Sequence, residues 1–327
     1  MVNIERIGVY TSGGDAPGMN ACLRAIVRTA SAQDLDVIGI RRGYEGMIEG
    51  DFVEMERRSV SNIVQQGGTI LKSARSEEFY SEAGRTQAAE NVKANGIDAL
   101  VAIGGDGTFR GASRFCQEHG IPTVGCPGTI DNDLFGTDAT IGYDTALNTA
   151  IENIDRIRDT ADAHNRLFLV EVMGRDAGFI ALNCGIGGGA ELVLIPETIT
   201  EMDEIKERIL SLMSAQRRST IVVVAEGDEL GGARGIEQAL HQDEAFEDID
   251  LRATILGHTQ RGGAPTASDR VLASRLGVAA VESLLDGHTN IMVGFVKGEI
   301  KLTPLHNVWG RTKNIDYDLL KLTQLLS

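Results

Sequence analysis

Two kinds of apolar pattern follow one another along the chain. Short apolar runs, typical of buried strands, precede longer segments in which apolar residues recur every three or four positions, as on one face of a helix. The runs predict strands at residues 7–10, 37–40, 97–103, 121–126, 167–172, 191–195, 219–225 and 253–256. The periodic segments predict helices at residues 19–30, 83–95, 108–119, 143–161, 176–184, 201–215 and 267–285. Strand followed by helix, repeated throughout, predicts an α/β fold with largely parallel sheets.

The predicted strands are more than one compact sheet easily holds. The chain has 327 residues, of which 42% are hydrophobic, so it can bury the core of one large domain or of two ordinary ones. We therefore expect two doubly wound lobes. Neither a low-complexity linker nor a short-period repeat marks a boundary between them.

The charge and the cysteine content argue against several classes of function. A net charge of −16 disfavours nonspecific binding to nucleic acid or to acidic lipid, although a few clustered arginines can still attract an anionic small molecule. No apolar run is long enough to span a bilayer, and residues 1–6 lack the basic start of a signal peptide. The four cysteines have no CxxC spacing and are typical of reduced thiols. We expect a cytoplasmic protein without a nucleic-acid or membrane partner.

Three predicted strands end in glycine-rich loops that carry aspartate. The loops are Gly13-Gly14-Asp15, Gly104-Gly105-Asp106-Gly107-Thr108 and Gly128-Thr129-Ile130-Asp131-Asn132-Asp133. Ligands of open parallel sheets bind at the carboxyl ends of strands, and glycine lets backbone N–H groups approach phosphate. An aspartate there can hold a metal ion or accept a proton. Together the loops predict phosphoryl transfer from a metal-bound nucleotide to a hydroxyl group.

Each of these motifs also has a purely structural interpretation. A single Gly-Gly-Asp loop is equally explained as a tight turn from strand to helix. Asp131 and Asp133 could cap their own backbone in a turn. In an extended stretch their side chains would instead point the same way, supplying a general base and a group that orients the base or the metal shell.

Arginines and one histidine are further candidate ligand-binding residues. Arginine pairs bidentately with phosphate, so arginines near glycine turns are candidate phosphate clamps. A surface ion pair is the alternative for any single arginine on a chain with 47 acidic residues, and we assign Arg156 and Arg270 to it. His258 has no second histidine or cysteine at metal-ligand spacing, so a neutral hydrogen-bonding side chain is expected there.

With these residues assembled, the chain resembles the ATP-dependent 6-phosphofructokinases of the bacterial type over essentially its whole length. The segments that carry the resemblance are 11–20, 104–108, 127–133, 172–175 and 252–263, with Asp269-Arg270 at the expected spacing. The resemblance implies a phosphofructokinase-like fold with a nucleotide-binding lobe (1–142 and 258–305) and a sugar-phosphate-binding lobe (143–257 and 306–327). It also implies a homotetramer with shared active sites that transfers the γ-phosphoryl group of MgATP to the 1-hydroxyl of fructose 6-phosphate in glycolysis.

The resemblance further implies a role for each site residue. MgATP is expected on Gly14, Arg75, Ser76, Gly105, Asp106, Gly107 and Thr108, with Asp106 oriented toward Mg²⁺. Asp131 is the expected general base beside Asp133, and Thr129 and Arg175 are expected to stabilise the transferring phosphoryl group. Fructose 6-phosphate is expected on Thr129, Ile130, Asp131, Met173, Gly174, Arg175, Glu226, His258 and Arg261, and on Arg166 and Arg252 of a neighbouring subunit.

The phosphoryl donor and regulation follow from smaller differences within the family. Pyrophosphate-dependent members tend to carry Asp and Lys where this chain has Gly107 and Gly128, so the two glycines favour ATP.

The implied effector site comprises Arg24, Arg28, Arg158, Glu191, Arg217 and Arg218. Asp51 and Ala215 replace basic residues common at that site, and a carboxylate facing phosphate repels it, so weaker effector binding is expected unless Arg217 and Arg218 compensate.

Three other functions compete with this one. The first is a pyrophosphate-dependent phosphofructokinase. The second is an NAD or lipid kinase, which shares a Gly-Gly-Asp-Gly loop but lacks the segments seen here at 128–133 and 252–263. The third is a catalytically silent subunit that senses sugar phosphate and regulates a partner. The presence of Asp106, Asp131 and Arg175 favours catalysis over the third function.

Overall fold

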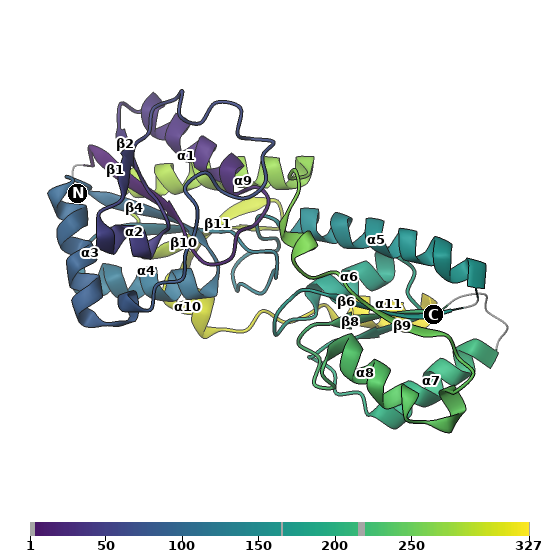
Figure 1. Cartoon of the computed structure of the whole chain (residues 1–327). Coiled ribbons are helices and arrows are strands. Elements are labelled where there is room, and N and C mark those ends of the chain that lie inside the picture. The colour runs from purple at the N-terminus through teal and green to yellow at the C-terminus, as the bar shows by residue number, and fades with distance from the viewer. Residues whose placement is uncertain (1–3, 165, 215–219, 327) are drawn as a thin grey trace. The chain divides into compact units, whose positions relative to one another are not determined.

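The structure is a computed structural model that describes residues 4–164, 166–214 and 220–326. The chain divides into two compact units. The first comprises Met1–Ile130, Leu134–Thr145 and Arg261–Lys313, and the second comprises Asp131–Asp133, Ala146–Gln260 and Asn314–Ser327. Each unit is built on its own sheet, and most of the strands and helices are labelled in Figure 1.

The sheet of the first unit is mainly parallel. Its seven described strands have the order β11-β10-β5-β4-β1-β2-β3. The inner strands run parallel, and β3 and β11 pair antiparallel at the two edges. The bounds are β1 (Arg6–Thr11), β2 (Asp36–Ile40), β3 (Phe52–Glu54), β4 (Ala99–Gly104), β5 (Thr123–Pro127), β10 (Ile291–Val296) and β11 (Glu299–Pro304).

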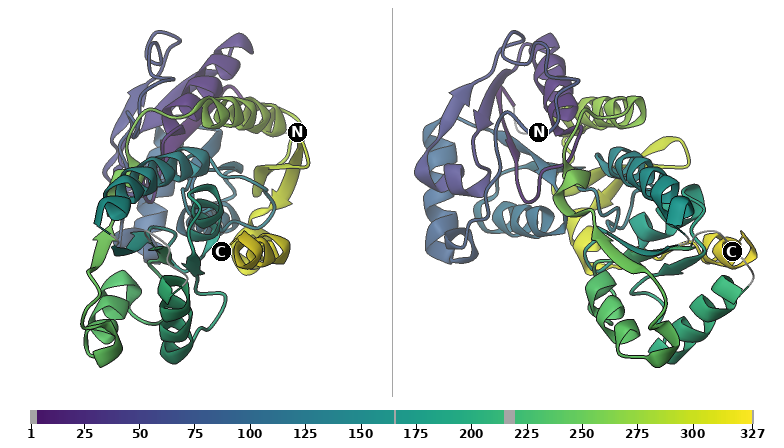
Figure 2. Two further views of the ribbon diagram at one scale, coloured as in Figure 1. Left: turned by 90° about the vertical axis from the view of Figure 1, so that its right-hand side faces the viewer. Right: turned by 45° about the vertical axis from the view of Figure 1, so that its right-hand side comes forward.

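Helices cover both faces of this sheet. On one face α1 (Met19–Ala32) packs against α9 (Ala267–Leu285), and the purple α1 and the yellow-green α9 lie side by side in every view of Figures 1 and 2. A Cβ atom at Gly277 would stand 2.7 Å from that of Ala25, so this close crossing needs glycine. The other face carries α2 (Tyr44–Glu49), η1 (Glu78–Tyr80), α3 (Glu82–Ala94), α4 (Asp106–His119) and α10 (Leu305–Gly310).

The core under α2, α3 and α4 is aromatic. Tyr44 stacks on Phe79 with ring centroids 3.9 Å apart, and the centroid of Phe79 lies 5.6 Å from that of Phe115. Burying each such ring contributes about 1.5–3 kcal/mol. Because Phe79 belongs to the 3₁₀ helix η1 and Phe115 belongs to α4, this packing holds the segment before α3 against α4.

The second unit is built on a fully parallel sheet of order β7-β8-β6-β9 among the described residues. The strands are β6 (Leu167–Val172), β7 (Leu192–Leu194), β8 (Thr220–Ala225) and β9 (Leu251–Ile255). The helices are α5 (Tyr143–His164), α6 (Phe179–Gly187), α7 (Met202–Ser214), α8 (Gly232–His241), α11 (Tyr317–Leu326) and the 3₁₀ helices η2 (Glu244–Phe246) and η3 (Gly257–Arg261). Ile205 and Ile209 of α7 and Leu240 of α8 share a buried core with Leu169 and Val222 of the sheet.

The predicted α/β class with largely parallel sheets is confirmed, and each predicted strand and helix has a counterpart. The pattern missed α2, β3, α8, β10, β11, α10 and α11, which are short or carry few buried apolar residues. Residues 215 and 219, at the ends of two predicted elements, lie outside the described residues. The assignment of nucleotide and sugar phosphate to separate lobes, with the boundaries given above, stays a prediction. No helix in the described part of the chain combines the length and apolar character needed to cross a bilayer.

Candidate active site

Three loops meet at one edge of the first sheet, because β1, β4 and β5 are adjacent and parallel. The N–H group of Ser12 donates to the carbonyl oxygen of Ile103 at 3.0 Å. The N–H group of Gly128 donates to the carbonyl oxygen of Gly104 at 2.9 Å. Thr108 Oγ1 donates to the carbonyl oxygen of Ser12 at 3.1 Å. Hydrogen bonds thus join the loops after all three strands.

Glycine is required where these loops approach one another. A Cβ atom at Gly104 would stand 2.4 Å from Thr108 Oγ1 and 2.6 Å from the carbonyl oxygen of Ser12. Gly13 has a φ of 83°, in the region that favours glycine. A Cβ atom at Gly107 would meet nothing within 4 Å among the described residues, so this position faces open space.

Gly128 has a different reason to be glycine. A Cβ atom there would lie 3.0 Å from Ile103 Cγ2 and 3.1 Å from Met19 Cε, both in the core. Packing within the first unit therefore accounts for this glycine whichever phosphoryl donor is used. Of the two glycines taken to favour ATP, only Gly107 borders open space.

The first turn of α4 lies beside the joined loops. α4 begins at Asp106, directly after Gly105, and the first N–H groups of a helix are available to an anion. The Asp106 carboxylate is partly exposed and lies 3.5 Å from Arg110 Nη2, one helical turn further on. A Cβ atom at Gly105 would lie 3.5 Å from Thr129 Cβ, so Thr129 borders the same turn.

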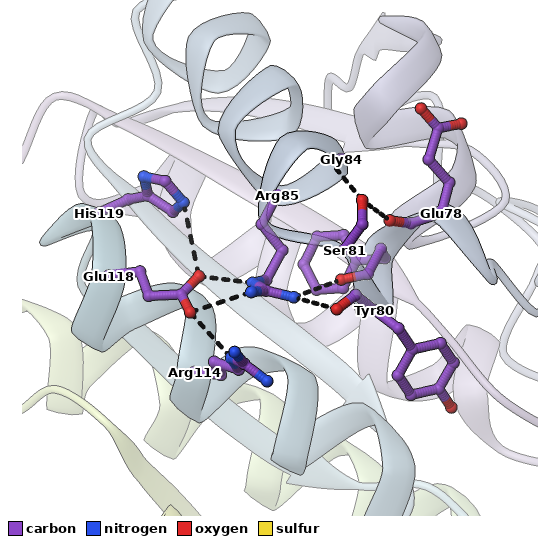
Figure 3. Close-up of polar contacts among 9 residues, drawn as sticks. Glu78, Tyr80, Ser81, Gly84, Arg85, Arg114, Glu118 and His119 are labelled. Atoms are coloured by element: carbon purple, nitrogen blue, oxygen red, sulfur yellow. Dashed lines mark hydrogen bonds and ion pairs between the residues drawn. The ribbon is translucent and has the colours of Figure 1, made fainter.

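Arg85, a residue that sequence reasoning missed, holds the end of the segment that carries Arg75 and Ser76. Figure 3 shows the contacts of Arg85 with Tyr80 and Glu118. The Arg85 side chain is only 2% exposed, and its Nη1 atom donates to the carbonyl oxygens of Phe79 (2.9 Å) and Tyr80 (2.7 Å). Its Nε and Nη2 atoms donate to the two carboxylate oxygens of Glu118 at 2.5 and 3.0 Å. Since Glu118 belongs to α4, the end of this segment is fixed to the helix that starts at the phosphate loop.

Arg261, expected on the sugar phosphate, lies against the first loop in this structure. Its Nη1 atom donates to the carbonyl oxygen of Asp15 at 3.1 Å, and a Cβ atom at Gly14 would stand 2.7 Å from the same nitrogen. Both residues belong to the first unit. The structure therefore places a positively charged side chain, that of Arg261, beside the glycine loop after β1.

The segment with the predicted base is not extended. Asp131 and Asn132 are buried, at 7% and 4% exposure, and Asn132 has a φ of 55°. A left-handed residue between Asp131 and Asp133 breaks the two-residue alternation of a strand, so the premise that their side chains share a direction for that reason is wrong. Asn is among the residues that tolerate this conformation.

In the second unit, three consecutive backbone amides after β6 are bound by side chains. The N–H group of Met173 donates to Gln260 Oε1 (2.8 Å), and that of Arg175 donates to Glu226 Oε1 (2.6 Å). The N–H group of Gly174 lies 3.4 Å from the same Glu226 oxygen. The Arg175 side chain is exposed, with its guanidinium 3.6 Å from Asp176. Sequence reasoning gave Gln260 no role.

Arg166 and Arg252 share one carboxylate. Arg166 Nε lies 2.5 Å from Asp250 Oδ2, and Arg252 Nη2 lies 3.0 Å from Asp250 Oδ1. Parallel pairing of β6 with β9 places the starts of the two strands side by side and so brings the arginines together. His258 lies exposed on η3, a few residues beyond β9.

The predicted effector residues are only partly brought together. In the second unit Arg158 Nη1 lies 3.4 Å from Glu191 Oε1, and Arg158 Nη2 donates to the carbonyl oxygens of Gly188 and Gly189 at 2.7 and 2.6 Å. Glu191 also lines a cavity of about 530 Å³ with Thr198, Arg208, Ser211 and Thr323. Arg24 and Arg28 lie half-buried on α1 in the first unit. Ala215, Arg217 and Arg218 lie outside the described residues.

Asp51 is compensated by two arginines. Its carboxylate oxygens lie 3.6 Å from Arg41 Nη1 and 3.2 Å from Arg42 Nη2. The expectation of weaker effector binding considered compensation by Arg217 and Arg218 alone, and these two residues lie outside the described residues, so it stays a prediction. Of the two arginines assigned to surface ion pairs, Arg156 pairs with Glu152, whereas Arg270 Nε donates to the carbonyl oxygen of Pro265 at 2.7 Å.

Known proteins share this sequence and fold. The family model described as Phosphofructokinase matches residues 6–284. ATP-dependent 6-phosphofructokinase 1 of Thermus thermophilus is 56% identical over 324 residues, 99% of this chain and 100% of its own. ATP-dependent 6-phosphofructokinase 2 of Bacteroides thetaiotaomicron is 51% identical over 327 residues, all of both chains.

Solved structures agree with these relatives. Phosphofructokinase of Saccharomyces cerevisiae aligns at a TM-score of 0.86 and 38% identity over 98% of this chain, which spans 46% of that longer chain. A pyrophosphate-dependent phosphofructokinase of Marinobacter aquaeolei aligns at a TM-score of 0.85 over 96% of this chain and 86% of its own, but at 22% identity it supports the fold alone.

Glycine loops and carboxylates at the ends of parallel strands define a phosphotransferase of the α/β class. Within that class, the family match and the near-complete alignment at more than half identity identify the family. The chain belongs to the phosphofructokinase family.

Proposed function

We propose that this protein is an ATP-dependent 6-phosphofructokinase. It transfers the γ-phosphoryl group of MgATP to the 1-hydroxyl of fructose 6-phosphate and gives fructose 1,6-bisphosphate and ADP, a step of glycolysis. The observation that carries the proposal is the hydrogen-bonded joining of the loops at Gly13, Gly104 and Gly128 at one sheet edge. The names of the full-length relatives, as ATP-dependent enzymes, support it further.

The first unit is assigned to the nucleotide. Phosphoryl transfer depends on alignment and on neutralisation of charge more than on covalent chemistry. Backbone N–H groups at Gly14 and from Gly105 to Thr108, with the positive end of α4, suit the phosphates. Arg75 and Ser76 complete this set from the segment that Arg85 holds in place.

Asp106 fits a magnesium ion. The described residues contain no group of three acidic, histidine or cysteine side chains that could hold a metal by themselves. Mg²⁺ is commonly bound through one or two carboxylates together with substrate phosphates and waters, so a single carboxylate beside a phosphate loop suffices. When bound, Mg²⁺ neutralises the charge of the β- and γ-phosphate oxygens.

Asp131 is assigned as the general base that takes the proton from the 1-hydroxyl, with Asp133 beside it. Thr129 and Arg175 are assigned to the transferring phosphoryl group, whose oxygens they neutralise or hydrogen-bond. The sugar phosphate is assigned to Thr129, Ile130, Asp131, Met173, Gly174, Arg175, Glu226, His258 and Arg261. Glu226 is anionic, so it suits sugar hydroxyls rather than phosphate.

Arg166 and Arg252 are assigned to the sugar 6-phosphate of a neighbouring subunit, which requires an oligomer, and the family resemblance supports a homotetramer. Their shared contact with Asp250 supports a joint role, because one carboxylate holds both guanidinium groups beside the first residues of β6 and β9. Effector binding at Arg24, Arg28, Arg158, Glu191, Arg217 and Arg218 is proposed on the same basis of family resemblance. A cytoplasmic location is proposed as well.

One assay tests the function. Formation of fructose 1,6-bisphosphate is measured with either ATP or pyrophosphate at saturation, with Mg²⁺ present in both. We expect turnover when ATP is the phosphoryl donor and none when pyrophosphate is the donor. Faster turnover with pyrophosphate would make the protein a pyrophosphate-dependent enzyme, and binding of fructose 6-phosphate without turnover on either donor would identify a regulatory subunit.

A further inference from the structure

We propose that Gln260 is a positioning residue for the turn that carries Arg175. Gln260 is completely buried and lies in η3, which follows β9. Its Oε1 atom accepts the N–H group of Met173, the first residue after β6. The inference rests on the proposed function, because it takes Arg175 to be the group that stabilises the transferring phosphoryl group.

The turn receives side chains from both neighbouring strands. β6 lies between β8 and β9 and runs parallel to each, so the three strands end at the same edge. Glu226 follows β8 and accepts the N–H group of Arg175, while Gln260 follows β9 and accepts that of Met173. Backbone hydrogen bonds also continue the sheet at this edge. The N–H group of Leu256 donates to the carbonyl oxygen of Glu171, and that of Glu226 donates to the carbonyl oxygen of Val172, the last residue of β6.

The turn needs such support because its conformation is unfavourable. Arg175 has a φ of 56°, a left-handed conformation that a long side chain rarely adopts. Gly174 has a φ of 151°, and a Cβ atom at Gly227 would stand 2.1 Å from the carbonyl oxygen of Arg175. Left-handed non-glycine residues persist only where the surrounding structure fixes them, and they concentrate at functional sites. Gln260 and Glu226 supply that fixation from two sides.

The chemistry of a glutamine amide suits this position. Met173 N–H is buried and needs an acceptor, and a neutral acceptor adds no negative charge to a site assigned to a sugar phosphate. The Nε2 atom of Gln260 is also buried and has no hydrogen-bond partner among the described residues. A buried amide N–H without a protein acceptor is available to a water molecule or to a bound ligand.

The experiment compares Gln260→Met with Arg175→Ala and with the double variant. Met has a similar length but lacks the amide, so the Met173 N–H loses its acceptor and the turn loosens. We expect kcat to fall about 10–100-fold, since a misplacement of about 1 Å costs a factor of that order. The KM for ATP should be unchanged, because the nucleotide is assigned to the other unit. In the Arg175→Ala background, Gln260→Met should lower kcat less than twofold further, because the residue acts through Arg175.

Three further variants keep the test decisive. If Gln260→Met does not fold, Gln260→Asn replaces it, since its shorter amide cannot reach Met173. Thr259→Val is the matched control on η3: it removes a 2.8 Å hydrogen bond to the carbonyl oxygen of Leu256 without touching the turn, and should retain kcat. Gln260→Glu keeps the acceptor, so kcat should recover while the KM for fructose 6-phosphate rises from the added charge.

The outcomes separate this inference from the proposed function. Normal kcat in Gln260→Met, with kcat lost in Arg175→Ala, would overturn the inference and leave the function intact. Full additivity of the two changes, or an equal loss of kcat in Thr259→Val, would also overturn it. Normal kcat in Arg175→Ala would overturn the role proposed for Arg175, and the inference with it.

Discussion

Arg85 and Glu118 form a two-pronged ion pair between α3 and α4, with the Arg85 guanidinium almost completely buried. The same guanidinium donates to the backbone of Phe79 and Tyr80, and Glu118 is approached in addition by Arg114 and His119 (Figure 3). A charge so placed is costly to bury without its partner. The pair therefore links the stability of the first unit to the position of the segment that carries Arg75 and Ser76.

Glu118→Gln should destabilise the protein at pH 7 by about 1–3 kcal/mol, because a charge-assisted hydrogen bond to a buried guanidinium is lost. The hydrogen bond from Arg85 lowers the pKa of Glu118 from 4.5 to about 2. A pKa lowered in the folded state gives stability that is complete above the unfolded value of 4.5 and is lost as the pH falls toward 2.

Urea denaturation of the wild type and Glu118→Gln at pH 7 and at pH 3.5 measures this effect. The difference between the two proteins should shrink at the lower pH. Glu77→Gln, at an exposed glutamate in the neighbouring segment, is the control and should change stability by less than about 0.5 kcal/mol. If the stability difference between the wild type and Glu118→Gln instead grew at pH 3.5, the ion pair would not be the source of the stabilisation.

Arg85→Lys should raise the KM for ATP while leaving that for fructose 6-phosphate unchanged. Lysine keeps the charge but cannot make the forked contacts to Glu118 and to the carbonyl oxygens of Phe79 and Tyr80 at the same time. The segment with Arg75 and Ser76 then loses its fixed end. Steady-state kinetics with each substrate varied in turn checks this, and Arg114→Lys, at an exposed partner of the same carboxylate, serves as the control.

Much of this architecture could be predicted from the sequence, and the reasons are local. Strands β1, β4 and β5 are short apolar runs that lead into glycine-rich loops, so both the strands and the loops after them were predicted. Gln260 and Asp250 could not be assigned, because their contacts depend on which strands are neighbours of β6, and strand order is not written in any local pattern. Arg85 was missed for a related reason: its burial depends on Glu118, which lies 33 residues further along the chain.

Asp131→Asn should lower kcat by about 10²–10⁴-fold, since it keeps the shape of the side chain and removes the proton acceptor. Equilibrium binding of fructose 6-phosphate, followed by calorimetry, should change little. Near-normal turnover in a folded Asp131→Asn protein would reject Asp131 as the base. Asp138→Asn, at an exposed aspartate in the same connection, is the control and should retain turnover.

Arg252→Ala should raise the KM for fructose 6-phosphate, because it removes a charge-assisted contact to the 6-phosphate. Hybrid oligomers test whether this contact crosses a subunit interface. Mixing Asp131→Asn chains with Arg252→Ala chains should restore activity at sites that combine one intact half from each. Mixtures that exchange subunits but gain no activity would place Arg252 in the site of its own chain.

Asp51 gives the last prediction, on regulation. Asp51 pairs with Arg41 and Arg42, which precede α2, and Arg42 also pairs with Glu49, so the Asp51 carboxylate neutralises part of this cationic charge rather than standing alone. Asp51→Asn releases that charge, so an anionic effector such as ADP or phosphoenolpyruvate should bind more tightly. Partly screened unit charges a few ångströms apart interact by about 1–4 kcal/mol, which corresponds to a tightening of roughly fivefold or more. Arg42→Gln should weaken effector binding instead.

An effector alters sugar-phosphate affinity only through its different affinities for two states, so the measurement is a fructose 6-phosphate saturation curve at several effector concentrations for each protein. Equal effector response in wild type, Asp51→Asn and Arg42→Gln would show that this cluster does not face the effector.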